Sequence, residues 1–102
     1  MRFRVALGTA LVRASFSAAA QDPAEVTRGA QLYAKNCSTC HGARMVGPEW
    51  AIDLKTFPKD ERARFIDSVT NGKGGMPPWG DVLKPDEIAS LWAYVVSGGE
   101  TK

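Results

Sequence analysis

The chain has 102 residues, with 13 lysines and arginines, 11 aspartates and glutamates, one histidine and two cysteines. This length allows a single domain. Arg2, Arg4 and Arg13 lie in the first 20 residues, so residues 21–102 carry ten basic and 11 acidic groups. A near-neutral domain of this kind excludes nucleic-acid binding as an expected function. No apolar run is long enough to span a bilayer.

The first 20 residues predict a secretory signal peptide, with the functional domain in residues 21–102. A basic start, Met1 to Arg4, precedes the apolar run from Val5 to Val12. Small residues up to Ala20 then provide a cleavage position. Because Arg13 interrupts the apolar run early, an ordinary N-terminal helix is the alternative interpretation. We expect export to the periplasm with cleavage near Ala20, and a monomeric product.

A first helix is predicted to begin at Asp22. Asp22 can cap this helix, Pro23 suits the first helical position, and Glu25 has the spacing of a capping box. Glycine inside a helix costs about 1 kcal/mol relative to alanine, so Gly29 predicts a close helix crossing. The apolar stripe of this helix consists of Val26, Gly29, Ala30, Tyr33 and Cys37.

Two further helices are predicted downstream of a loop that covers residues 42–58. The second helix is expected at about 58–70 and the last at about 85–97, with Asn71-Gly72 and Gly98-Gly99 as stop signals. Strand signals are almost absent, so the predicted fold class is all-α. The expected inward faces are Ala63, Phe65, Ile66 and Val69 in the second helix, and Ile88, Leu91, Trp92 and Val95 in the last.

The segment Cys37-Ser38-Thr39-Cys40-His41, here called the CSTCH motif, carries the clearest chemical signal. Two thiols three positions apart, followed by a histidine, match the covalent attachment site of a c-type haem. On one helical turn both thiols can reach the vinyl groups of one porphyrin, and His41 can offer a nitrogen to the iron. A redox disulfide and half of a zinc site are the alternatives. The chain has no further cysteine or histidine for zinc. It also lacks the βαβ pattern of thioredoxin-like proteins.

The second iron ligand must come from Met45, Met76, a lysine or an open position, because the chain has one histidine. Met45 lies four residues after His41 and is too near to reach the opposite face, so it is expected in the core. Met76 follows two glycines, which let the backbone approach closely, and precedes two prolines, which fix its direction. We therefore predict Met76 as the second ligand.

The CSTCH motif, Gly47-Pro48, the GGMPPW segment and the final amphipathic helix together resemble a small monohaem class I cytochrome c. The resemblance covers essentially all of residues 21–102. It implies a cytochrome c fold, in which three to four helices wrap around one covalently bound haem c with its iron. It also implies that the first and last helices cross, with contacts among Gly29, Tyr33, Leu91 and Tyr94.

The same resemblance suggests further residues around the haem. It implies that the Pro48 carbonyl accepts a hydrogen bond from the His41 ring, which would fix the ring and its electron donation. The resemblance does not extend to the contacts of the haem propionates, for which Arg44 and Trp79 are candidates. Trp50 departs from the family, which usually has a smaller aliphatic residue at that position.

A one-electron carrier is the expected function, and not an enzyme, because no base, nucleophile or open metal position is evident. The expected partners are redox proteins, namely a donor dehydrogenase and a downstream acceptor. The segment MPPW and the last helix resemble small cytochromes that accept electrons from quinoprotein (PQQ) alcohol dehydrogenases. They also resemble cytochromes that accompany the haem-containing nitrite reductase. A haem-based ligand sensor in which Met76 swings away, and a peroxidase-like centre, are the remaining alternatives.

Overall fold

The computed structural model describes residues 22–99, and the predicted signal peptide lies outside this range. Within residues 22–99 the structure contains helices and no strand, which confirms the all-α fold class. None of the described helices is long and apolar enough to cross a membrane. In chain order the elements are α1 (Pro23–Asn36), α2 (Ser38–His41), the 3₁₀ turn η2 (Leu54–Thr56), α3 (Arg62–Asn71) and α4 (Pro85–Val96).

Helix α1 begins as the sequence predicts. The Asp22 carboxylate accepts a hydrogen bond from the backbone N–H of Ala24 at 3.1 Å, and Pro23 occupies the first turn. The carboxylate of Glu25 has a different role from the one expected. It accepts a hydrogen bond of 3.3 Å from the hydroxyl of Ser90 on α4, so it joins two helices instead of completing a capping box.

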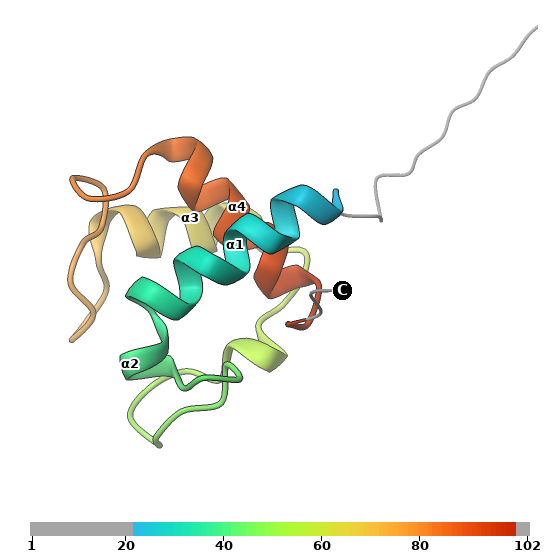
Figure 1. The fold of residues 1–102 in the computed structure, drawn as a ribbon. Helices are drawn as coiled ribbons and strands as arrows, with labels where there is room; N and C mark the ends of the chain where they lie inside the picture. Colours follow the sequence, from blue (N-terminus) through green and yellow to red (C-terminus); the bar gives the residue numbers. More distant parts are fainter. Residues whose placement is uncertain (1–21, 100–102) are drawn as a thin grey trace, which may run out of the picture.

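Figure 1 shows that α1 crosses α4. The two helices are in direct contact at Gly29. A Cβ atom at Gly29 would overlap the carbonyl oxygen of Ser90 and would lie 2.8 Å from the Cβ of Tyr94. One turn further along α1, the rings of Tyr33 and Tyr94 pack with their centroids 5.3 Å apart. The crossing and its contacts are therefore confirmed, and Leu91 is buried in the same region.

Helix α3 begins four residues later than expected. The N–H of Glu61 donates to the carbonyl of Pro58 at 3.2 Å, so residues 58–61 form a turn and the helix starts at Arg62. Phe65 and Val69 are buried as predicted, whereas Ala63 is exposed. Ala63 stands two positions before Phe65, about 200° around a helix, and so cannot share its face.

An aromatic cluster fixes the long segment between α2 and α3 to the helices. Phe57, at the end of η2, packs against Phe65 of α3 and Trp92 of α4 with centroid distances of 5.8 and 5.9 Å. Phe65 and Trp92 also pack together at 5.2 Å. Because Lys55 donates a hydrogen bond of 2.9 Å to the carbonyl of Gly98, the same segment is tied to the end of α4.

Candidate functional site

The CSTCH motif forms a single helical turn attached to the end of α1. Cys37 follows the last residue of α1, and its carbonyl accepts hydrogen bonds from Cys40 at 3.2 Å and from His41 at 2.9 Å. The Ser38 hydroxyl donates to the carbonyl of Ala34 at 2.9 Å, so α2 is also bonded back to α1. Both cysteines are free thiols, Cys37 half-buried and Cys40 exposed. The structure thus presents two thiols and one imidazole on one fixed turn.

The chemistry of these thiols argues against a redox disulfide. Burial raises the pKa of the Cys37 thiol to about 11, with a smaller contribution from the charge of Cys40. A redox-active pair needs a thiolate at neutral pH, which requires the opposite shift. Within residues 22–99 no group of three or more histidine, cysteine, aspartate or glutamate side chains is arranged to hold a metal ion. The zinc interpretation therefore has no support in this region.

The chain turns sharply directly after His41. Gly42 has φ 89°, and a Cβ there would overlap the carbonyl oxygen of Val46. The buried hydroxyl of Tyr33 donates a hydrogen bond of 2.5 Å to the Gly42 carbonyl. Burial raises the pKa of Tyr33 far above its usual value, so this hydroxyl remains a donor. Met45 ends the turn in a left-handed conformation (φ 67°) with its side chain fully buried, in the core position expected for it.

The following loop returns over the motif and contacts the His41 ring. The backbone of Gly47 passes so close that a Cβ there would lie 2.9 Å from the carbonyl oxygen of Cys40. The Nδ1 atom of His41 lies 3.3 Å from the carbonyl oxygen of Ile52. In the tautomer with its proton on Nδ1, His41 donates to this carbonyl and keeps the lone pair of Nε2 for a metal.

Pro48, the residue that the family resemblance places beside the His41 ring, lies in the same loop, and its contact with the ring stays a prediction. Its carbonyl accepts a hydrogen bond of 3.0 Å from the N–H of Ala51, while the ring of His41 meets Ile52. The turn from Pro48 to Ala51 reverses the chain and brings the Ile52 carbonyl to the ring. No side-chain pattern in the sequence distinguishes one backbone carbonyl from the next, so Ile52 could not have been identified beforehand.

Met76 lies on a second loop, which is fastened independently to the end of α3. Lys73 and Met76 exchange two backbone hydrogen bonds, of 3.0 and 2.9 Å. The N–H of Trp79 donates to the carbonyl of Val69 at 2.8 Å. The loop passes so close to Gly72 that a Cβ there would lie 2.8 Å from the Met76 carbonyl oxygen. The side chain of Met76 is half-buried and packs against the core.

The remaining sequence-predicted residues lie on the surface or at its edge. Arg44 is exposed and Trp79 is half-buried against the core, so their propionate contacts stay predictions. Trp50 is 73% exposed, and its neighbours Val46 and Ile52 are also more than half exposed. The loop that contacts His41 therefore presents an apolar surface.

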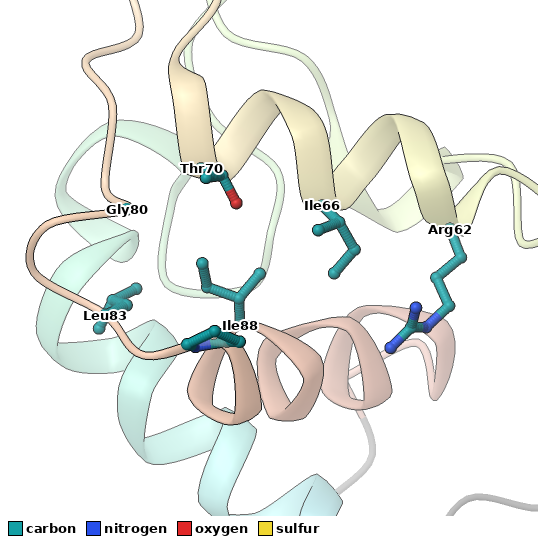
Figure 2. Close-up of a pocket in the computed structure, with 7 residues that line it drawn as sticks. Arg62, Ile66, Thr70, Gly80, Leu83 and Ile88 are labelled. Carbon is teal, nitrogen blue, oxygen red and sulfur yellow. The ribbon is translucent and has the colours of Figure 1, made fainter.

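A separate cavity of about 360 Å³ lies between α3 and the chain that leads into α4 (Figure 2). Leu83 and Ile88 are buried beneath it, and Ile66 and Arg62 contribute from α3. None of the residues lining it belongs to the CSTCH motif or is Met76. This cavity is therefore distinct from the candidate site.

Comparison with known proteins assigns the family. The sequence model described as "Cytochrome C oxidase, cbb3-type, subunit III" matches residues 24–95. Cytochrome c6 of Nostoc sp. is 35% identical over 97 residues, which cover 90% of this chain and 86% of that protein. The chain belongs to the class I cytochrome c family. This membership implies a covalently bound haem c with iron and a role in electron transport.

Other relatives of this cytochrome are longer proteins. The FixP subunit of the cbb3-type cytochrome c oxidase of Azorhizobium caulinodans is 35% identical over 97 residues, and the chain spans 33% of its length. The quinohemoprotein alcohol dehydrogenase ADH IIB of Pseudomonas putida is 36% identical over 78 residues. The matched segment covers 74% of this chain and 11% of that protein. Cytochrome cL of Hyphomicrobium denitrificans has a similar fold, with a TM-score of 0.60 and 23% identity over 74% of this chain and 48% of that one.

The residues of this cytochrome fit a haem c by the chemistry of their donor atoms. Two free thiols lie on one turn, as attachment to both vinyl groups of one porphyrin requires. A histidine follows with Nδ1 facing a carbonyl, and a thioether side chain stands on a separate fixed loop. An imidazole nitrogen and a thioether sulfur are known axial ligands of cytochrome c iron.

Proposed function

We propose that the chain is an exported one-electron carrier. In this proposal Cys37 and Cys40 hold one haem c through thioether bonds, and His41 and Met76 bind its iron. The observation that carries the proposal is the fixed turn of α2, which joins two free thiols to a histidine whose Nδ1 already faces a carbonyl. Export to the periplasm, with cleavage near Ala20, rests on the basic and apolar pattern of the first 20 residues.

The bound haem supplies an iron atom that gains and loses one electron. The chain supplies ligands that set the potential and stay in place. The Met76 thioether is a soft ligand, which favours the reduced state and raises the reduction potential. The hydrogen bond at Nδ1 of His41 holds the ring and increases its electron donation. Because backbone hydrogen bonds fasten the α2 turn and the Met76 loop, the protein has little to rearrange when the charge on the iron changes.

We infer that the chain passes electrons and catalyses no reaction of its own. His41 is the single histidine, and its assignment to the iron leaves no second imidazole to act as a distal acid or base. The ligand-sensor alternative requires Met76 to leave its position. The two backbone hydrogen bonds between Met76 and Lys73 oppose such a movement. The two prolines that follow Met76 oppose it as well, because they restrict the backbone.

A quinoprotein (PQQ) alcohol dehydrogenase is the proposed electron donor. The similarity to part of the quinohemoprotein alcohol dehydrogenase ADH IIB supports a donor of this class. The similarity to the FixP subunit supports a cbb3-type oxidase as the downstream acceptor. No observation specifically favours the nitrite-reductase alternative. Purified PQQ alcohol dehydrogenase with ethanol should reduce the protein in stopped-flow experiments, and reduction only in the presence of a nitrite reductase partner would contradict this assignment.

Mass and spectrum test the haem assignment. Intact mass of the exported protein should equal the chain from about Gln21 plus one haem, and free thiols at both cysteines would contradict the proposal.

In the oxidised protein, Met76→Ala should abolish the weak absorption at the red edge that accompanies thioether ligation, and should lower the potential. Met45→Ala is the matched control, because Met45 is fully buried in the core. Loss of the band in the Met45 variant instead would show that the ligand has been misassigned.

A further inference from the structure

Tyr33 bonds to both ends of the CSTCH motif. The residue lies on α1 and is 2% exposed. Its backbone carbonyl accepts a hydrogen bond of 2.8 Å from Cys37, the first residue of the motif. Its side-chain hydroxyl donates a hydrogen bond of 2.5 Å to the carbonyl of Gly42, the residue directly after His41. One residue of the helix thus fixes the backbone on either side of the two thiols and the imidazole.

The Gly42 carbonyl is the point on which the following turn depends. It also accepts a hydrogen bond of 3.1 Å from the N–H of Met45, which closes the turn. Met45 adopts φ 67°, a conformation that is uncommon for a residue other than glycine and persists when its surroundings fix it. The Tyr33 hydroxyl is part of those surroundings, because it holds the carbonyl to which Met45 is bonded.

The turn from Gly42 to Met45 also helps to place the Ile52 carbonyl, which faces the His41 ring. The carbonyl of Met45 accepts hydrogen bonds from the N–H groups of Leu54 and Lys55 at 3.0 and 3.4 Å. These two residues directly follow the segment that carries Ile52, whose carbonyl oxygen lies 3.3 Å from Nδ1 of His41. Hydrogen bonds joined by short stretches of backbone therefore connect the Tyr33 hydroxyl to the ring of the proposed iron ligand.

We propose that Tyr33 is a positioning residue for His41, acting through its hydroxyl on the Gly42 carbonyl. The inference rests on the proposed function, in which His41 binds the iron. The simpler alternative is that the hydroxyl only satisfies its own burial at the crossing of α1 and α4. The two interpretations differ in what happens to the His41 ring when the hydroxyl is removed and the aromatic ring is kept.

Tyr33→Phe and Tyr94→Phe form a matched pair for this test. Their rings pack together with centroids 5.3 Å apart, and each variant loses one phenolic oxygen from the same helix crossing. In the described part of the chain the Tyr33 hydroxyl bonds to Gly42, whereas the Tyr94 hydroxyl has no hydrogen-bond partner. We would measure, in the haem-bearing proteins, the rate at which the His41 Nδ1 proton exchanges with deuterium, by NMR of the reduced form.

Tyr33→Phe should accelerate this exchange about fivefold, the factor that corresponds to the net free energy of one hydrogen bond. It should also raise the reduction potential, because a weaker hydrogen bond at Nδ1 reduces electron donation by the imidazole. Tyr94→Phe should leave both quantities at their wild-type values.

Equal exchange rates and potentials in the two variants would overturn the positioning role. The role would be overturned whether both variants change equally or neither changes, because a general loosening of the helix crossing would affect the two variants alike. The proposed function is tested separately by the intact mass. A wild-type protein without covalent haem would overturn the proposed function before any exchange is measured, whereas haem-bearing variants with identical exchange would overturn only the role of Tyr33.

Discussion

Replacing Gly29 by alanine tests the packing on which the fold depends. The substitution adds one methyl group where α1 crosses α4. That methyl group would overlap the carbonyl oxygen of Ser90 and lie 2.8 Å from both the Ser90 carbonyl carbon and the Cβ of Tyr94. Ordinary contacts at a Cβ atom measure 3.4–4 Å. Because the obstacle is backbone, which cannot rotate away, the helices must separate.

Two opposing contributions determine how much Gly29→Ala changes the free energy of unfolding. Overpacking of this kind costs about 1–3 kcal/mol, and a rigid backbone obstacle favours the upper part of that range. Alanine regains about 1 kcal/mol over glycine inside a helix. The expected net loss is therefore about 1–2 kcal/mol of unfolding free energy. For a domain of this size, each 1 kcal/mol lowers Tm by about 4–8 °C.

Denaturation of the haem-bearing protein by guanidinium chloride and by heat would measure this loss. Thr27→Ala provides the control, because Thr27 is exposed on the same helix. The control should be neutral or slightly stabilising, since alanine is the better helix former. If Gly29→Ala proved as stable as Thr27→Ala, the close approach of α1 and α4 would be refuted.

Two further substitutions test the core and one ion pair. Met45→Ala should cost about 2–5 kcal/mol of stability, as expected for a fully buried methionine, and retention of the red-edge absorption would separate this effect from iron ligation. Asp86→Asn should remove a pH-dependent contribution to the free energy of unfolding, because the hydrogen bond from Arg28 at 3.2 Å lowers the pKa of Asp86. A depressed folded-state pKa stabilises the protein above the ordinary carboxyl pKa and ceases to do so as the pH falls through the folded value. Urea titrations from pH 6 to pH 3 should therefore show the difference between wild type and variant disappearing in acid, and a constant difference would contradict the assignment.

The helices could be predicted because their ends and faces have side-chain signatures. Asp22 and Pro23 identified the start of α1, and the spacing of Phe65 and Val69 identified the buried face of α3. Gly29 indicated the crossing before any contact was known, since a glycine inside a helix needs a packing reason. The start of α3 was placed too early because the turn that follows Pro58 is held by a backbone hydrogen bond, which no side chain in the sequence signals.

For the candidate site, the sequence likewise points to side chains and not to backbone contacts. The spacing of the two cysteines and His41 predicts the donor atoms, and the residues around Met76 predict the second ligand, and these assignments stay predictions. The family resemblance implies Pro48 as the partner of the His41 ring, which stays a prediction, and the nearness of the Ile52 carbonyl to Nδ1 had no signal in the sequence. The bond from Tyr33 to Gly42 was also missed, although a glycine directly after the motif was a usable sign of a close backbone approach.

Helices α2 and α3, which precede the two loops of the candidate site, end with the same backbone arrangement. Gly42 ends α2 with φ 89° and ψ 149°, and Gly72 ends α3 with φ 83° and ψ 164°. At each glycine the backbone of the following loop passes where a side chain would stand, near Val46 in one case and near Met76 in the other. The loop that follows His41 and the loop that carries Met76 are therefore folded back onto the ends of helices, where backbone contacts hold them. An imidazole and a thioether held in this way stay in fixed positions although neither belongs to a long helix, which is the rigidity that a carrier of single electrons requires.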